Sequence, residues 1–173
     1  LRHRYLINCL PFMTYSFDSL TIDLPDEEAT LAAGHALAQC LQPGMTVYLQ
    51  GDLGAGKTTL SRGLLRGLGH QGRVKSPTYT LVESYPLATC TVHHFDLYRF
   101  ADPAEWHEAG LSELFDAHSL CLIEWPDKAG TWLPAADVLL ALTLEGEGRR
   151  LTLTACSPQG HACLTRLISL AVP

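Results

Sequence analysis

Apolar and polar residues follow two periodicities along this chain, and together they predict strands that alternate with helices. Short runs rich in β-branched and aromatic residues, ended by glycine, proline or a carboxylate, are typical of strands. Such runs cover Thr46–Gln50 and residues 80–85, 91–95, 120–124, 138–144 and 149–156. Apolar residues at helical spacing, with glycine or proline beyond the last turn, predict helices. These helices are expected over residues 26–42, 57–68, 161–171 and 103–116, the last with a break at Gly110.

The order of these elements indicates one α/β domain with three layers. Residues 80–85 and 91–95 are close enough for an antiparallel hairpin, and so are residues 138–144 and 149–156, which the turn EGEG joins. The run LCLIE at 120–124 is apolar up to its last residue, which is typical of a strand buried in a parallel sheet. We therefore expect a mixed, mainly parallel central sheet.

Composition narrows the possible classes of protein. The chain has 173 residues, of which 47% are hydrophobic and 17% charged, and this excludes intrinsic disorder. No apolar run approaches the roughly 18 residues of a membrane-spanning helix. The formal charge of −6 gives no indication of the basic surface that direct nucleic-acid binding would require.

The six cysteines contain no C-x-x-C pair, so the sequence predicts neither a zinc ribbon nor a redox motif. A chain of this length can bury a sufficient core without disulfides. We expect the cysteines to be buried thiols in a reducing compartment, which favours the cytoplasm.

Residues 1–12 differ from the rest of the chain. They carry two arginines and a short apolar run interrupted by Asn8 and Pro11, without a cleavage site of small residues. We expect this stretch to be a non-native or disordered extension, and residues 13–173 to form the functional domain.

Residues 51–58 read GDLGAGKT and match the phosphate-binding pattern G-x-x-x-x-G-K-[ST]. The glycines allow a tight turn whose N–H groups face an anion, and the following helix adds the positive end of its dipole. The Lys57 ammonium can reach the β- and γ-phosphates of a nucleotide, and the Thr58 hydroxyl can bind Mg²⁺. The expected nucleotide contacts are Gly51, Asp52, Leu53, Gly54, Ala55, Gly56, Lys57, Thr58 and Thr59.

Three further residues are candidates for metal and hydrolysis chemistry. Glu124 ends the strand LCLIE, where P-loop proteins place a carboxylate that helps to hold Mg²⁺. Asp96 ends TVHHFD and could bind the metal through water or orient the attacking water. Thr78 lies in the loop KSPTYT, where nucleotide switches place a threonine that senses the γ-phosphate. The alternative for Glu124 is an ordinary carboxylate at a strand end, and for Asp96 an ordinary carboxylate before a loop. The alternative for Thr78 is a role in the turn at residues 76–77.

Neighbouring positions carry weaker signals. His93 and His94 are adjacent, so in a strand they point to opposite faces, and packing is favoured over catalysis for both. Trp125 follows Glu124 directly and lies at the mouth of the expected site, with core packing as the alternative.

Two classes of P-loop protein fit the sequence less well. GTPases read guanine with N-K-x-D, and the only asparagine of this chain is Asn8. Small-molecule kinases usually add a substrate domain and an arginine-bearing lid, and no insertion of that kind is apparent. A small-molecule kinase and a nucleotide-dependent binding module remain the alternatives to an ATPase.

Four blocks, taken together, resemble a known family. They are GDLGAGKTTLSRGL (51–64), VKSPTYTLVESY (74–85), HHFDLYRF (93–100) and IEWPDKAG (123–130). In this order and spacing they are similar to the bacterial tRNA threonylcarbamoyladenosine-biosynthesis ATPases, the TsaE family, over about residues 18–156. The resemblance implies a P-loop α/β fold, with ATP and Mg²⁺ as cofactors and slow, partner-dependent hydrolysis. The implied partners are two paralogous sugar-kinase-like subunits, which modify the adenosine beside the anticodon and which the ATPase resets.

The resemblance also implies roles for single residues. Lys57 contacts phosphate, and we expect it to be exposed at the start of its helix. Thr58 and Glu124 hold Mg²⁺, while Asp96 and Thr78 serve the hydrolysis step.

Less specific parts of the resemblance concern the base and the partners. A helix start from Glu27 to Thr30 and the basic residue Arg149 are placed near the adenine or its phosphates. Trp125 is placed near the partner surface. Contacts with tRNA would come chiefly through the partner subunits, which agrees with the acidic composition.

Overall fold

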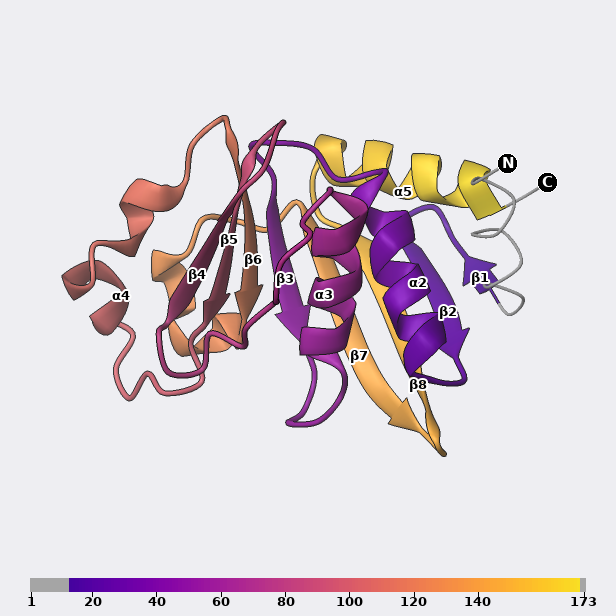
Figure 1. The fold of residues 1–173 in the computed structure, drawn as a ribbon, viewed down its shortest axis with the longest axis horizontal. Helices are drawn as coiled ribbons and strands as arrows, with labels where there is room; N and C mark the ends of the chain where they lie inside the picture. The colour runs from indigo at the N-terminus through magenta and orange to yellow at the C-terminus, as the bar shows by residue number, and fades with distance from the viewer. Residues whose placement is uncertain (1–12, 172–173) are drawn as a thin grey trace.

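Eight strands form one sheet in the computed structural model, which describes residues 13–171 (Figure 1). The strands span Met13–Tyr15 (β1), Ser19–Leu24 (β2), Thr46–Gln50 (β3), Val82–Pro86 (β4), Thr91–Asp96 (β5), Ser119–Glu124 (β6), Val138–Glu145 (β7) and Gly148–Ala155 (β8). The α-helices span Glu27–Ala38 (α2), Lys57–Gly67 (α3), Glu105–Glu108 (α4) and Pro158–Ala171 (α5). Short 3₁₀ turns span Leu111–Leu114 (η1), Pro126–Lys128 (η2) and Gly130–Trp132 (η3).

The sheet is mixed, with parallel strands at its centre. Its order is β1-β2-β8-β7-β3-β6-β5-β4, and β7, β3, β6 and β5 pair in parallel. The strands outside this group pair antiparallel, so both expected hairpins, β4 with β5 and β7 with β8, are confirmed. The carboxyl ends of the four parallel strands therefore meet at one edge of the sheet, the lower edge in Figure 1.

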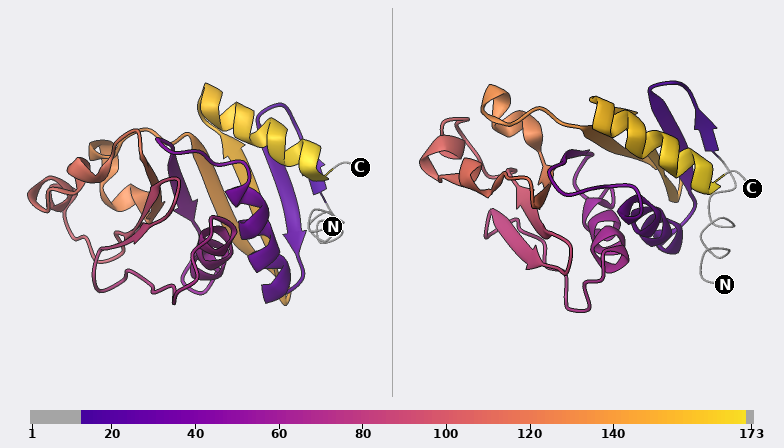
Figure 2. Two further views of the ribbon diagram at one scale, coloured as in Figure 1. Left: turned by 45° about the horizontal axis from the view of Figure 1, so that its top comes forward. Right: turned by 90° about the horizontal axis from the view of Figure 1, so that it is seen from above.

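Helices α2 and α3 pack closely against each other on one face of the sheet (Figure 2). Small residues make this approach possible: a Cβ atom added to Gly63 of α3 would collide with the Leu31 carbonyl of α2, and one added to Gly34 of α2 with the Leu60 carbonyl of α3. Helix α3 starts at the edge where the parallel strands end (Figure 1). The close helix pair therefore fixes the position of the residues that begin α3.

Two apolar clusters cover the two faces of the sheet. The larger cluster joins the sheet to α2, α3 and the buried side of α5, including Leu164 and Leu167. The smaller cluster packs the aromatic residues Phe95, Trp106 and Phe115 against the other face, with ring centroids of Phe95 and Trp106 5.6 Å apart. Helix α4 and η1 belong to this side (Figure 2). The expected α/β class is confirmed, and one outer layer consists mainly of short elements.

Two expectations about secondary structure were wrong. The sequence predicts a helix over residues 103–116, but α4 has only four residues, and Gly110, with φ of 65°, leads into η1. The break at Gly110 was predicted correctly because glycine readily adopts this left-handed conformation. The sequence reading also missed β1 and β2, although SLTIDL in β2 buries every second residue.

Other element boundaries shift by a few residues. Helix α2 ends at Ala38 instead of residue 42, and α5 begins at Pro158 instead of residue 161. The expected extension over residues 1–12 lies outside the described residues. Among residues 13–171, no helix has both the length and the apolar character that crossing a membrane demands.

The cysteine prediction holds for most of the described positions. The free thiols of Cys40, Cys90, Cys121 and Cys163 are buried, whereas Cys156 is exposed, contrary to expectation. Cys156 directly follows β8, where the chain turns at the surface toward α5. Burial raises the pKa of the Cys121 thiol to about 12, so this thiol behaves as an apolar core group at neutral pH.

Candidate functional site

The loop over residues 51–58 connects β3 to α3, as its motif predicts, and its glycines have backbone conformations that other residues adopt at a cost. Gly51 and Gly56 have φ values of 147° and 105°. A Cβ atom at Gly51 would also lie 2.6 Å from the Leu142 carbonyl of β7. The loop therefore packs tightly against the end of the sheet only because glycine stands at these positions.

The start of α3 leaves backbone N–H groups available to an anion. No side chain in the described part of the chain caps this helix, and its N-cap residue is Gly56. The first N–H groups of a helix have no partner within it, and the helix dipole adds positive potential there. The loop and the helix start together form a site suited to phosphate.

Side chains within the loop take different positions. Leu53 is 80% exposed, whereas Ala55 is buried against the sheet. Thr58 and Thr59, on the first turn of α3, are half-buried. The loop therefore exposes its tip and presents its backbone and first helical turn to a ligand.

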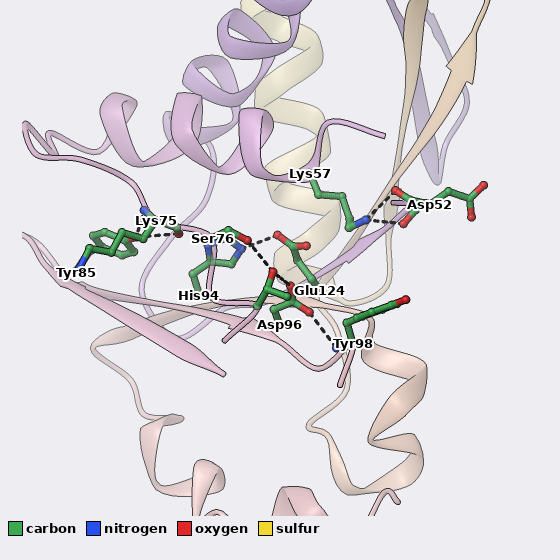
Figure 3. A network of polar contacts seen from close by, with 11 residues as sticks. Asp52, Lys57, Lys75, Ser76, Tyr85, His94, Asp96, Tyr98 and Glu124 are labelled. Carbon is green, nitrogen blue, oxygen red and sulfur yellow. Dashed lines mark hydrogen bonds and ion pairs between the residues drawn. The ribbon is translucent and has the colours of Figure 1, made fainter. Parts of the chain in front are cut away.

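Lys57 is buried within its own loop instead of exposed as expected, with 5% of its surface accessible. Its Nζ donates hydrogen bonds to the carbonyl oxygens of Gly51 at 2.6 Å and of Asp52 at 3.0 Å (Figure 3). Among the described residues, these acceptors are uncharged carbonyl groups and not carboxylates. A phosphate entering the loop would supply the negative charge that this ammonium lacks.

Asp96 and Glu124 lie side by side at the carboxyl ends of β5 and β6, where they are register partners. Both are buried, with 4% and 3% of their surfaces accessible. Asp96 accepts a hydrogen bond from the Thr78 hydroxyl and one from the Tyr98 backbone N–H, both at 2.9 Å (Figure 3). Thr78 in turn lies 2.9 Å from the Ser76 hydroxyl. The structure thus brings together three residues predicted from separate motifs.

His94 contacts Glu124, which the sequence analysis missed. Its Nε2 lies 2.8 Å from Glu124 Oε1, and its side chain is fully buried (Figure 3). The neighbouring His93 points to the other face of the sheet, where its Nδ1 lies 2.8 Å from the Ser84 hydroxyl. Burial lowers the pKa of His93. The signal for His94 was available, because residues two apart in a strand share a face and His94 is two before Asp96.

Two of the three residues expected near the adenine or its phosphates lie beside the loop. A Cβ atom at Gly56 would lie 3.7 Å from Arg149 Nε and 3.9 Å from Thr30 Cγ2, so both side chains border the loop. Glu27 instead forms a partly exposed ion pair with Arg62 of α3, with 3.4 Å between Oε1 and Nη1. Their contacts with a nucleotide stay a prediction.

Trp125 follows β6 with a left-handed backbone conformation, φ 55°. Its ring centroid lies 4.7 Å from Lys57 Nζ and 5.1 Å from the Tyr98 ring centroid. The partner contact expected for Trp125 stays a prediction. A cavity of about 240 Å³ next to it is lined by Leu49, Gln50, Gly51, Asp52, Trp125, Pro126 and Asp127.

The donor set suits Mg²⁺ shared with a nucleotide better than a metal centre built by protein alone. Within residues 13–171, no group of three or more His, Cys, Asp or Glu side chains could hold a metal ion. Mg²⁺ usually keeps several waters and takes one or two carboxylates plus substrate phosphates. Thr58, on the first turn of α3, and Asp96 and Glu124, at the ends of β5 and β6, offer the hydroxyl and carboxylate oxygens that this requires.

Comparisons with known proteins match this chain to one family. The family model "Threonylcarbamoyl adenosine biosynthesis protein TsaE" matches residues 24–152, which include all four motif blocks. The chain is 49% identical over 143 residues to the Haemophilus influenzae tRNA threonylcarbamoyladenosine biosynthesis protein TsaE, covering 80% of this chain and 90% of that protein. It is 36% identical over 129 residues to the Bacillus subtilis protein of the same name, covering 74% of this chain and 80% of the relative.

A solved structure extends the likeness to the whole fold. The crystal structure of Bacillus subtilis YdiB superposes with a TM-score of 0.76 at 27% sequence identity, covering 91% of this chain and 97% of that one. From the family model, the relatives and this fold, the chain belongs to the TsaE family of tRNA threonylcarbamoyladenosine biosynthesis proteins.

Proposed function

We propose that this protein is a Mg²⁺-dependent ATPase that serves the threonylcarbamoyladenosine modification of tRNA. It would work with two paralogous transferase subunits and hydrolyse ATP to reset their complex. The observation that carries the proposal is the order of the parallel strands: an uncapped helix start with Lys57 follows β3, and buried carboxylates end the next two strands, β6 and β5. Family membership supports the tRNA pathway.

The first function of the site would be to bind the phosphate chain. The loop N–H groups and the Lys57 ammonium would contact the phosphate oxygens, with Arg149 close enough to add a second positive charge. Mg²⁺, when bound, would neutralise charge on the phosphates, and Thr58 and Glu124 would hold it. Glu124 is suited to this role because its carboxylate lies at the sheet edge and is held by a hydrogen bond.

The second function would be to position water for hydrolysis. Asp96 is fixed by two donors, the Thr78 hydroxyl and the Tyr98 N–H, which leaves lone pairs of the carboxylate for water. An ionised carboxylate in this position can orient water and accept its proton. Thr78, on the loop before β4, would bring its hydroxyl toward the terminal phosphate. The Thr78–Asp96 bond would therefore link phosphate sensing to water activation.

Dependence on partners would follow from the small number of cations at the site. Transition-state charge on phosphate is often stabilised by groups from a second chain, which contribute roughly 10³–10⁵-fold in rate. Trp125 lies at the rim of the loop, where a docking partner could order it together with the Thr78 loop. The buried thiols fit a reducing compartment, and we propose a cytoplasmic location.

A pull-down with the two purified transferase subunits tests the proposal. The immobilised chain should retain both subunits with ATP and Mg²⁺, and retention should change when ADP replaces ATP or nucleotide is omitted. The Lys57→Ala variant, tested at an ATP concentration that its weakened affinity leaves unsaturating, serves as the matched control. Retention that is equal in all nucleotide states, or absent in all, would contradict the proposed cycle.

A small-molecule kinase is the second candidate, because the cavity of about 240 Å³ beside the loop could hold an acceptor. Its lining includes the polar side chains of Gln50, Asp52 and Asp127. A kinase needs such an acceptor, whereas an ATPase releases phosphate to water. Phosphate release that requires no small acceptor and rises with the transferase subunits would favour the ATPase. A nucleotide-dependent binding module would bind ATP and partners without phosphate release.

A further inference from the structure

His94 has a buried environment that packing alone does not explain. Its side chain is fully buried in β5, and its Nδ1 atom has no hydrogen-bond partner among the described residues. A buried polar atom without a partner destabilises the folded protein, and an apolar side chain of similar size would avoid that cost. The polar contact that His94 does make is with Glu124.

The His94–Glu124 contact determines how the carboxylate is oriented. A carboxylate that binds Mg²⁺ is ionised and has only acceptor oxygens, so in that role Glu124 Oε1 would accept the hydrogen bond from His94 Nε2–H. A rigid imidazole ring, held on all sides by the core, restricts the rotation of that carboxylate. His94 Nε2 lies 2.8 Å from Glu124 Oε1, so the other carboxylate oxygen, Oε2, does not contact His94 in this way.

The two site carboxylates are held in different ways. Asp96 is held by the Thr78 hydroxyl and the Tyr98 N–H, both from segments outside the core strands. Glu124 is held by His94 from the neighbouring strand of the central sheet, where His94 is paired with Leu122 in register. Glu124 is therefore fixed by the rigid sheet, while the Asp96 contacts depend on loops.

We propose that His94 is a positioning residue for Glu124: its Nε2–H holds Oε1 and leaves Oε2 free to bind the Mg²⁺ that accompanies a nucleotide. This inference rests on the proposed function, because it takes Glu124 as a metal-binding group. Groups that orient a metal ligand commonly change metal affinity by about 10–100-fold when they are removed. His94 itself would touch neither nucleotide nor metal.

Calorimetric titration of the full chain with ATP, in excess Mg²⁺ and in EDTA, tests the proposal. The quantity to compare is the ATP affinity in Mg²⁺ divided by the ATP affinity in EDTA. This ratio separates the contribution of the metal from phosphate binding by the loop. His94→Phe removes the donor and keeps an aromatic ring, and should lower this ratio by about tenfold or more. His94→Gln keeps an N–H donor of suitable reach and should restore most of the ratio. His93→Phe, on the opposite face, is the matched control and should leave the ratio as in the parent.

A fourth variant keeps the test decisive where burial of Phe prevents folding. His94→Asn carries the same amide as Gln on a shorter chain, so it should fall short of Glu124 and lose the Mg²⁺ dependence that Gln keeps. A ratio in folded His94→Phe or His94→Asn equal to that of His93→Phe would overturn the His94 proposal alone. A parent protein whose ATP affinity is the same with and without Mg²⁺ would overturn the metal site of the proposed function, and the His94 proposal with it.

Discussion

The Nζ atom of Lys57 lies 4.7 Å from the centroid of the Trp125 ring, so the cation of the phosphate loop and the aromatic residue after β6 are in direct contact. This contact joins the start of α3 to the residue that follows β6. If a partner binds at Trp125 as proposed, a change there would reach the lysine that we expect to contact phosphate. The Lys57–Trp125 contact would thus couple the proposed docking surface to the proposed nucleotide site.

Replacing Trp125 should reduce stimulation by partners more than it reduces ATP affinity. A cation–π contact contributes about 0.5–2 kcal/mol, so Trp125→Ala should weaken ATP binding by about 30-fold at most. The rate increase on adding the transferase subunits should fall further, because the ring that would meet the partner is gone. Trp125→Phe, which keeps a ring over Lys57, is the control. Full stimulation of the Ala variant by the partners would rule out this role.

Replacing Lys57 should strongly lower the affinity for ATP without unfolding the domain. A charge-assisted hydrogen bond contributes about 1.5–3 kcal/mol, so Lys57→Ala should lower ATP affinity by about 10- to 100-fold in calorimetry. The free energy of unfolding should change by less than the roughly 2–5 kcal/mol of a core leucine truncation. Arg166→Ala, an exposed cation on α5, controls for net charge and should bind ATP as the parent does.

Changes at the two adjacent carboxylates should have different effects, on metal binding at Glu124 and on water activation at Asp96. Glu124→Gln keeps an acceptor for His94 but removes the charge, so the gain in ATP affinity on adding Mg²⁺ should shrink by about tenfold. Asp96→Asn should bind ATP and Mg²⁺ nearly as the parent does. Its hydrolysis rate should drop by about 10²–10⁴-fold, because an amide accepts no proton. An Asn variant that hydrolyses ATP at the parental rate would mean that these roles are assigned wrongly.

Stability should fall in mildly acidic solution because of His93. Burial lowers the pKa of His93 below its ordinary value of 6.5, so the unfolded chain binds more protons than the folded protein between these two pKa values. The contribution of His93 to the free energy of unfolding is therefore fully present above the unfolded pKa. It is lost progressively as the pH falls from the unfolded pKa to the lower folded pKa. Urea unfolding at about pH 7.5 and about pH 5.5 should show a smaller loss for His93→Gln than for the parent. Ser84→Ala should keep the parental pH dependence, since burial is the main cause of the shift; equal losses in the parent and His93→Gln would contradict this account.

The sequence predicts the phosphate loop well because its parts are consecutive along the chain. A strand, a glycine-rich turn and a helix are local features, and the structure confirms all three from β3 to α3. The burial of Lys57 was not predictable in the same way. Its Nζ turns back onto carbonyls of its own loop, and the Trp125 ring that lies 4.7 Å away comes from a segment 68 residues farther along the chain.

Asp96 and Glu124 could each be predicted from the sequence as site residues, but their proximity in the fold could not. Asp96 and Glu124 each end an apolar strand, and this local pattern marks both. Their proximity depends on β5 and β6 being neighbours in the sheet, which strand order determines and local sequence does not. His94 was interpreted as packing because its partner, Glu124, is 30 residues away in the chain.

Local signals also failed where tertiary contacts determine secondary structure. The stretch from residue 103 to 116 has helical composition, yet Trp106 and Leu111 are buried on either side of Gly110 against one aromatic cluster. A continuous helix through Gly110 would not keep this arrangement, since its φ of 65° turns the chain there. Strand β2, by contrast, has a clear alternation that should have been recognised.

Phosphate release from ATP, measured for the isolated chain and again with both transferase subunits, tests the central claim most directly. The account predicts slow release by the chain alone, a clear rise when both subunits are present, and no rise for Asp96→Asn under the same conditions. Fast release by the isolated chain that the two subunits neither bind nor change would contradict it.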